Sequence, residues 1–345
     1  MKKTTIILGI TGLIALGANA QDIHFSNMEY SPMTLNPALA GANNDLQVIS
    51  NYRTQWNAVP SAAPFNTIAL SGDMRLNSKK PNKSGHLALG LNLFNDRAGV
   101  NRISTNNVGL SIAYHLLVGD NSTVGLGLQS GFGQRTLDAT DGMWGNQYNG
   151  LAYDPSLPNG ENLGSPSFSF LDAGAGFVYT YGIKETRMRS NDGVKVNAGY
   201  AVFHVNRPNF SFTGGDDNLY MRHSFFANAK IGIGSTTMNI EPGIYTQIQG
   251  PSTEILMGAD YRVILKEGSK VTGNIQRTSV ALGVYYRNRD AVVSRILFNY
   301  AGFGVGFAYD FNVSSLTEVT NARGGAEFFL RWTMDNPFSA SKARI

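Results

Sequence analysis

Apolar residues alternate with small or polar residues along many segments of the chain. In segment 302–311 the even positions hold only glycine, alanine and aspartate, and the odd positions hold Phe303, Val305, Phe307, Tyr309 and Phe311. Successive side chains of a β-strand point to opposite faces, so this period of two predicts a strand with one apolar face. The opposite face of such a strand is lined by small or polar side chains.

The same alternation predicts fourteen strands. Most of them run for about 10 to 13 residues, whereas strands of soluble proteins average about five or six. The expected strands are 46–56, 66–76, 86–95, 105–117, 122–134, 167–181, 194–205, 222–233, 237–249, 253–265, 278–287, 291–300, 303–311 and 326–334.

Strand length separates two all-β architectures, because a soluble sandwich also alternates. A tilted strand that crosses a membrane needs about 9 to 11 residues, and an even strand number is typical of bacterial single-chain barrels. The polar face is rich in glycine, alanine and serine, which suits a narrow or filled lumen. We therefore predict an all-β fold: a transmembrane antiparallel β-barrel of about 14 strands over residues 46–334.

The lengths of the connections predict how the barrel is oriented. Barrels of this kind place short turns on the periplasmic side and long loops outside. If the first strand runs outward, the connections 135–166, 206–221 and 312–325 lie outside. Two expected periplasmic connections, 182–193 and 266–277, are longer than this rule predicts. They are either contact sites for periplasmic machinery or extended hairpin turns.

The N-terminus has the pattern of a cleaved secretory signal. Lys2 and Lys3 precede an apolar stretch at 6–16, and a small-x-small site ends at Ala20. This order of charged, apolar and small residues predicts cleavage before Gln21. The alternative, a buried N-terminal helix, would be expected to show a polar face, and the stretch has none. No later apolar run reaches the roughly 18 to 20 residues of a membrane-spanning helix.

The chain is thus expected to divide into four parts. These are a signal peptide at 1–20, a periplasmic or plug-like segment at 21–45, the barrel at 46–334 and a tail at 335–345. Turn-forming residues make segment 35–41 too irregular for a strand. It could sit inside the lumen as a plug, bind periplasmic partners or only seal the barrel floor, and we favour the plug.

Composition agrees with a membrane wall and removes several classes of site. Charged residues make up 15% of the chain, against about 25% in soluble proteins. The formal net charge of +4 carries no nucleic-acid signature. The chain has no cysteine, so disulfides and thiolate metal sites are excluded.

We expect no catalytic site. The five histidines do not show the spacing of a zinc site. The one His-x-Ser pattern, at His24 and Ser26, precedes the first expected strand and so does not lie on a strand face. His223 and Ser224 are adjacent, so a strand points them to opposite faces. Arg53 and Asp310 fall on lumen-facing positions, where we expect them to join a charged network, because an unpaired charge there would be costly.

The expected outer connection at 135–166 is the candidate partner-binding loop. Its exposed aromatic residues suit a protein-binding or self-packing surface. Its acidic residues do not reproduce an EF-hand loop, but isolated carboxylates could hold a calcium ion, and the sequence leaves the two interpretations open. The aromatic residues are Trp144, Tyr148 and Tyr153, and the acidic residues are Asp138, Asp141 and Asp154.

Several motifs along the whole chain resemble one known family. The first is the run Leu35-Asn36-Pro37-Ala38-Leu39-Ala40-Gly41, and later motifs contain Arg53, Gln55, Trp56, His204, Pro208, Tyr309 and Asp310. In order and spacing the chain resembles the PorP/SprF family of outer-membrane proteins of the Bacteroidetes type IX secretion and gliding motility system.

The resemblance implies a non-enzymatic barrel without cofactors. Such a barrel supports secretion and cell-surface attachment of a cargo, such as a gliding adhesin, by binding the cargo's C-terminal sorting domain. The implied partners are this cargo, periplasmic and outer-membrane secretion components and outer-membrane lipid, with no nucleic acid. The alternative function is an outer-membrane channel for small solutes or lipids.

Overall fold

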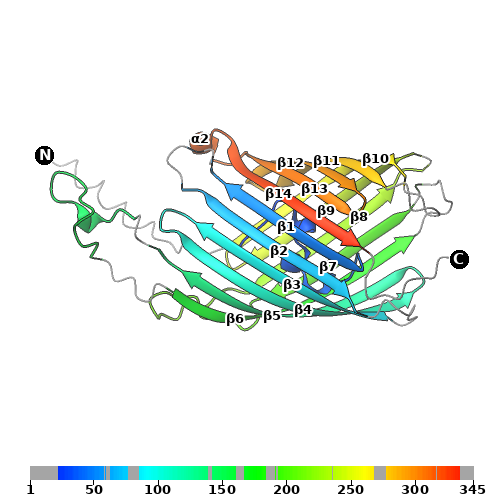
Figure 1. The fold of residues 1–345 in the computed structure, drawn as a ribbon, viewed down its shortest axis with the longest axis horizontal. Coiled ribbons are helices and arrows are strands. Elements are labelled where there is room, and N and C mark those ends of the chain that lie inside the picture. Colours follow the sequence, from blue (N-terminus) through cyan, green and yellow to red (C-terminus); the bar gives the residue numbers. More distant parts are fainter. Residues whose placement is uncertain are drawn as a thin grey trace.

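Fourteen antiparallel strands form one closed barrel (Figure 1). The computed structural model describes residues 22–57, 59, 63–76, 85–138, 142–160, 167–183, 191, 193–234, 236–267, 277–315 and 317–334. Each strand pairs with its neighbours in the chain, and the last strand pairs with the first to close the barrel. The strands are β1 Leu46–Gln55, β2 Phe65–Arg75, β3 Gly85–Ala98, β4 Ile103–Gly119, β5 Ser122–Thr136, β6 Ser167–Ile183, β7 Val194–Phe203, β8 Arg222–Gly232, β9 Met238–Gln249, β10 Ser252–Lys266, β11 Thr278–Arg287, β12 Ala291–Tyr300, β13 Phe303–Asn312 and β14 Arg323–Met334.

The strand predictions are confirmed in number, order and position. The largest differences are at the end of β3, which continues to Ala98, and at the start of β14, which begins at Arg323. Both extensions lack the alternation of apolar residues, yet their backbone continues the hydrogen-bonded ladder with β4 and β13. The ladder therefore runs beyond the stretch that the hydrophobic pattern marks.

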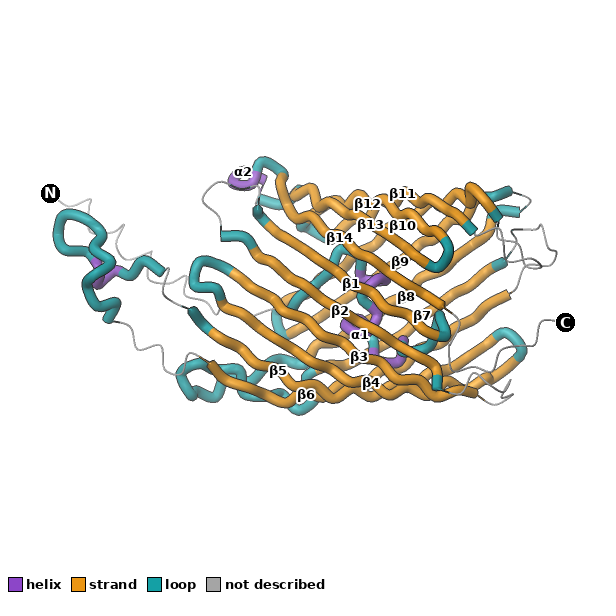
Figure 2. Tube along the Cα trace, in the orientation of Figure 1, coloured by secondary structure: helices purple, strands orange, loops and turns teal. Residues whose placement is uncertain are grey.

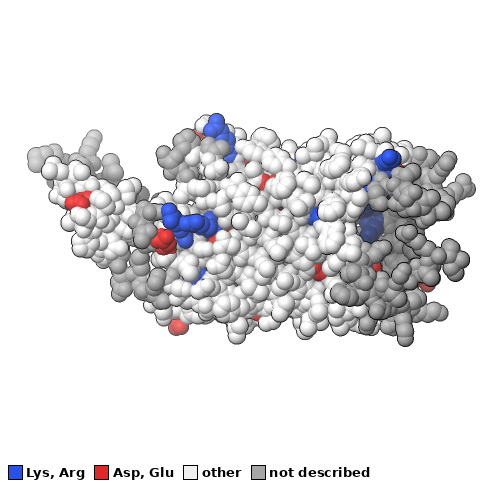
Figure 3. All heavy atoms as spheres, in the orientation of Figure 1, with Lys and Arg blue, Asp and Glu red and all other residues white. Residues whose placement is uncertain are grey.

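The wall of the barrel is apolar outside and polar inside. Leu128 and Leu282 are 69% and 60% exposed on the outer face, whereas Ala308 and Asp310 on the inner face are buried. In Figure 3 most of the visible wall shows no charged residues, and the larger clusters of charged residues lie near the two ends. An apolar outer face is what contact with lipid requires. None of the described helices is long and apolar enough to cross a membrane.

The two ends of the barrel differ in their connections. At the loop end, where odd-numbered strands finish, the β5–β6 connection contains the short helix η3 (Gly145–Gln147), and the β13–β14 connection contains α2 (Thr317–Thr320). At the turn end, strands β4 and β5 are joined by two residues, Asp120 and Asn121. The loop end also has a two-residue turn at Gly250 and Pro251, so length alone separates the ends only in part.

Residues 22–45, called the N-terminal segment below, lie inside the barrel (Figure 2). They contain the short helices η1 (Met28–Tyr30), α1 (Pro32–Leu35) and η2 (Pro37–Leu39). Met33 and Ala38 are fully buried and belong to the apolar core together with inward-facing side chains of the strands. The interior of the barrel is therefore filled largely by the chain's own first described residues.

The lipid-facing role of the outer side chains can be tested at the middle of β5. We expect Leu128→Arg to lower the free energy of unfolding in lipid vesicles by about 2–4 kcal/mol, because a charge at the bilayer midplane is costly. Urea unfolding followed by tryptophan fluorescence measures the change. Leu128→Met serves as the control, and equal shifts for both variants would contradict a lipid-facing position.

Candidate functional site

Asn36 fixes the middle of the N-terminal segment to the barrel wall. Its side-chain amide donates hydrogen bonds to the carbonyl oxygens of Phe177 and Tyr200, at 2.9 and 3.1 Å. Its side-chain oxygen accepts a hydrogen bond from the backbone N–H of Ala38 at 2.8 Å, which caps η2. One buried side chain therefore joins η2 to two neighbouring strands, β6 and β7.

Glycines in the wall make room for this contact. A Cβ atom on Gly127 would lie 2.6 Å from the Ala38 Cα, and one on Gly176 would collide with the Asn36 side-chain oxygen. A Cβ on Gly199 would lie 3.0 Å from the Asn36 nitrogen. Part of the glycine content of the inward face is thus explained by the close approach of Asn36-Pro37-Ala38.

Gly41 ends the motif at the turn end of the lumen. It has a φ of +65°, a conformation that glycine adopts without steric cost. Its N–H donates to the Asp73 carboxylate at 2.9 Å, and its carbonyl accepts from the Arg75 Nε at 2.6 Å. The neighbouring carbonyl of Ala40 lies 2.7 Å from the His115 Nε2. The motif residues Asn36 to Gly41 thus act as packing and hydrogen-bonding anchors in this structure.

A buried charge cluster holds the start of the N-terminal segment. The backbone N–H groups of Ser26 and Asn27 donate to the Glu327 carboxylate, at 2.6 and 3.1 Å. Arg53 lies between two carboxylates, 2.8 Å from Asp310 and 3.3 Å from Glu327. The prediction that Arg53 and Asp310 join a charged network in the lumen is therefore confirmed.

Arg287 extends this cluster across the barrel. Its guanidinium lies 2.9 Å from Asp310 and 3.1 Å from Glu254. It also donates to the Ser26 hydroxyl at 2.6 Å. Two arginines and several carboxylates from β1, β10, β11, β13 and β14 therefore converge on Ser26, with their side chains almost fully buried.

A second polar contact holds the N-terminal segment at the loop end. His204, at the end of β7, lies with one ring nitrogen 2.5 Å from the Asp22 carboxylate and with the other 2.9 Å from Asp172. Arg222 lies 3.5 Å from Asp22. Burial alone would lower the pKa of His204, but the two carboxylates, Asp22 first, raise it from 6.5 to about 9. Burial opposes ionisation of Asp22 as well, yet His204 and Arg222 hold the pKa of its carboxyl well below the usual 3.8.

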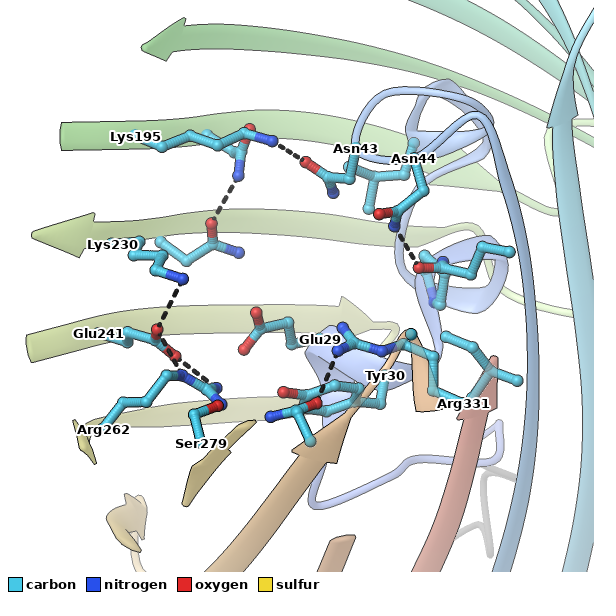
Figure 4. A pocket seen from close by; sticks show the side chains of 18 of the residues that line it. Glu29, Tyr30, Asn43, Asn44, Lys195, Lys230, Glu241, Arg262, Ser279 and Arg331 are labelled. Carbon is cyan, nitrogen blue, oxygen red and sulfur yellow. Dashed lines mark hydrogen bonds and ion pairs between the residues drawn. The ribbon is translucent and has the colours of Figure 1, made fainter. Parts of the chain in front are cut away.

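An open cavity lies in the lumen at the turn end (Figure 4). It has a volume of about 400 Å³. Its floor is formed by the N-terminal segment from Glu29 to Asn44, and its walls by the turn-end portions of strands from β1 and β7 to β14. The cavity is called the turn-end cavity below.

The three aromatic residues of the candidate partner-binding loop lie in the β5–β6 connection. Tyr148 and Tyr153 pair as an isolated β-bridge, and the Trp144 N–H donates to the Gln147 side chain at 3.2 Å. Tyr148 is 60% exposed. This arrangement leaves aromatic surface in solvent, while partner binding itself stays a prediction.

The calcium prediction is also untested. Within the described ranges, no group of three or more His, Cys, Asp or Glu side chains is placed to hold a metal ion. Asp138 lies near Arg102, at 3.7 Å, and Asp154 accepts hydrogen bonds from Ser156. Asp141 lies outside the described residues, as do Ala20, Gln21 and the tail 335–345.

The motif residue Leu35 is buried in the apolar core of the lumen. The motif residues Gln55, Trp56, Pro208 and Tyr309 have other surroundings. Gln55 is the last residue of the β1 ladder, and Trp56 follows it with its ring 4.8 Å from that of Phe65. Pro208 lies in the β7–β8 loop, where its carbonyl accepts from Leu219. Tyr309 is on the outer face beside Phe311.

Sequence reasoning missed Asp22, Glu254, Arg287 and Glu327 as anchors. A signal for the last three was present, because each is a charged residue at an inward-facing position of an alternating strand. Asp22 precedes the strands and carried no such pattern. The contact of His204 with Asp22 joins residues far apart in the chain, which spacing could not indicate.

A closed antiparallel barrel with an apolar outer wall and a polar, occupied interior is the architecture of outer-membrane β-barrel proteins. The chain belongs to the family described as type IX secretion system membrane protein PorP/SprF, whose family model matches residues 17–332. No match was found among curated proteins.

Solved outer-membrane barrels resemble the chain at low sequence identity. The toluene transporter TbuX of Ralstonia pickettii is 11% identical, with a TM-score of 0.47 over 88% of this chain and 93% of that chain. BamA from Haemophilus ducreyi lacking POTRA domains 1–3 is 11% identical, with a TM-score of 0.41 over 85% of this chain and 71% of that chain.

The fit between Asn36 and the wall glycines predicts a specific loss of stability. In Gly176→Ala the new methyl group displaces the Asn36 amide, so we expect the free energy of unfolding to fall by about 1–3 kcal/mol. The measurement is the urea midpoint of the purified barrel in detergent micelles.

A matched control lies in the same strand. The Cβ of Gly182→Ala would meet its nearest neighbour, the Val194 carbonyl oxygen, at 3.9 Å, so this variant should keep the stability of the wild type. The close fit of Asn36 would be refuted by equal stability of the two variants.

The His204 contact predicts a dependence of stability on pH. Because the pKa of His204 is raised from 6.5 to about 9, its contribution is fully present below about pH 6.5 and is lost as the pH rises through about 9. The Asp22 contribution, with a lowered pKa, is present above about pH 4 and is lost only in stronger acid. Both act together between these limits.

Unfolding midpoints at pH 6, 7.5 and 9.5 test this dependence. We expect the wild type to lose at most about 3 kcal/mol of stability over this range, and His204→Gln to remove most of the loss. His223→Gln, a histidine on the outer face, should leave the pH profile unchanged. A profile of His204→Gln that matches the wild type would show that the contact does not stabilise the barrel.

Proposed function

We propose that this protein supports type IX secretion and cell-surface attachment of a specific cargo, such as a gliding adhesin, by binding the cargo's C-terminal sorting domain. It acts without catalysis, as a platform in the outer membrane between the secretion components and the cargo. The observation that carries the proposal is the occupied lumen of a barrel that belongs to a type IX secretion family.

Residues 22–45 support this proposal over a channel. They cross the lumen from the Asp22 contact at the loop end to the Asp45 contact with Arg75 at the turn end. Core residues between these points, such as Met33 and Ala38, are fully buried. A segment packed in this way acts as a plug. The outer surfaces of the barrel and the cavities that open at its ends are then the parts that can bind a partner.

The β5–β6 connection supports an external contact. Leu151 is 92% exposed at the turn between Tyr148 and Tyr153, and Met143 is 77% exposed. Aromatic and methionine side chains are enriched in protein interfaces. In the expected orientation this apolar tip points away from the cell, where it meets the emerging cargo.

Replacing the apolar tip tests this contact. In a strain that lacks the chromosomal gene, we expect a variant with Met143, Tyr148 and Leu151 changed to serine to lower the amount of cargo at the cell surface by about tenfold, because truncated interface anchors usually lose most of the binding energy. Quantitative immunofluorescence measures the cargo at the cell surface. The change in the electrophoretic mobility of the barrel on heating shows whether the variant is folded.

The control variant removes exposed apolar side chains from another loop-end connection. Val313→Ser with Val319→Ser should retain cargo display if the β5–β6 loop makes the contact. Unchanged display in the gene deletion itself would overturn the secretion proposal. Large open-channel currents from the purified wild type in planar bilayers would favour the channel instead.

A further inference from the structure

The turn-end cavity contains more positive than negative charge. Its lining has two carboxylates, Glu29 and Glu241, and the five basic residues Lys195, Lys230, Arg262, Arg277 and Arg331. The positive excess faces the open cavity in the lumen at the turn end. A cavity of one sign of charge with protein walls concentrates ions of the opposite sign.

The two carboxylates neutralise only part of this charge. Glu241 lies 2.7 Å from the Arg262 guanidinium and 3.6 Å from the Lys230 ammonium group. Glu29 lies 3.6 Å from Arg295, which is not part of the cavity lining. Arg295 is itself paired with Asp260, so the Glu29 charge still counts in the cavity. With both carboxylates counted, the five cations leave a positive excess.

Lys195 and Arg331 are held by neutral groups instead. Figure 4 shows the Lys195 ammonium group pointing to Asn43, whose side-chain oxygen it contacts at 2.6 Å. Arg331 donates to the Asn299 side chain at 2.8 Å and lies over the Tyr30 ring at 5.3 Å. Within the described part of the chain neither cation has a carboxylate partner. These two side chains are positioned, but their charge is not balanced.

The cavity also has an apolar side and a continuation toward the rim. Pro32, Leu35 and Leu39 line the floor, and Tyr300 lies on the wall. A second hollow of about 570 Å³ shares Lys195, Lys230 and Arg277 with the first. Cavities of roughly 300–1,000 Å³ hold ligands much larger than a single small anion.

We propose that the turn-end cavity binds an extended acidic segment of a polypeptide, whose carboxylates meet Lys195, Lys230 and Arg277 and whose apolar side chains lie on the floor. The hydrogen-bonded strands of the closed wall separate the cavity from the membrane. The acidic segment therefore enters from the water at the turn end of the barrel. The inference rests on the proposed function, because it takes this segment to belong to the secreted cargo arriving from the periplasmic side.

Fluorescence anisotropy with purified full-length barrel in detergent tests the site. The probe is a short fluorescein-labelled peptide of alternating glutamate and leucine, and the reference is the same peptide with lysine in place of glutamate. We expect the acidic peptide to bind, the basic peptide to fail, and binding to weaken as salt is raised.

Two charge variants locate the binding. Removing three cavity cations should weaken binding by at least about tenfold, since each contributes a charge contact. Removing three exposed cations from the loop end should leave binding unchanged. The cavity variant combines Lys195→Gln, Lys230→Gln and Arg277→Gln, and the control combines Arg97→Gln, Arg207→Gln and Arg289→Gln.

A third variant separates charge from shape. Asn43→Trp keeps every cation but places a large ring at the cavity, so it should also weaken binding. The change in electrophoretic mobility on heating shows whether each variant is a folded barrel, and only folded variants are compared. Equal binding by the cavity and control variants, or displacement of the peptide by inorganic phosphate at equal concentration, would overturn the proposal.

The result can be separated from that of the proposed function. If the peptide fails to bind while cargo display still depends on the barrel, the acidic-segment site is wrong and the secretion role stands. If the peptide binds in the cavity while cargo display is unchanged in the gene deletion, the secretion role is wrong and the site stands.

Discussion

The pairing of buried charges inside the barrel is the interaction on which the rest of the structure depends. Arg53, Arg287, Asp310 and Glu327 are almost fully buried, and a buried charge that lost its partner would cost several kcal/mol. The strands alone do not complete this network, because the Ser26 hydroxyl and the backbone N–H groups at Ser26 and Asn27 fill positions within it. The N-terminal segment is therefore part of the barrel's electrostatic balance.

The wall and the segment are also matched in shape. Asn36 reaches two strand carbonyls because Gly176 and Gly199 leave space beside them, and Gly41 makes its turn where a side chain would touch Ala88. The interior is closely packed where charge and shape agree. It remains open at the turn-end cavity, where basic side chains face a hollow.

Much of the fold could be predicted from the sequence, because a strand between lipid and a polar interior must alternate with period two. Arg53 and Asp310 were predicted to join a charged network in the lumen for the same reason. The sequence could not place Asp22 against His204, since no local pattern links an irregular segment to a strand end 182 residues away. Nor could it show the turn-end cavity, which is formed by residues from many strands that share no motif.

Arg53 and Glu327 face each other across the pair formed by β1 and β14, the seam at which the cylinder closes. The same Glu327 carboxylate receives the backbone of Ser26 and Asn27. One carboxylate thus both pairs the last strand with the first and binds the N-terminal segment. Closure of the cylinder and placement of residues 22–45 are therefore energetically coupled, because loss of Glu327 would weaken both at once.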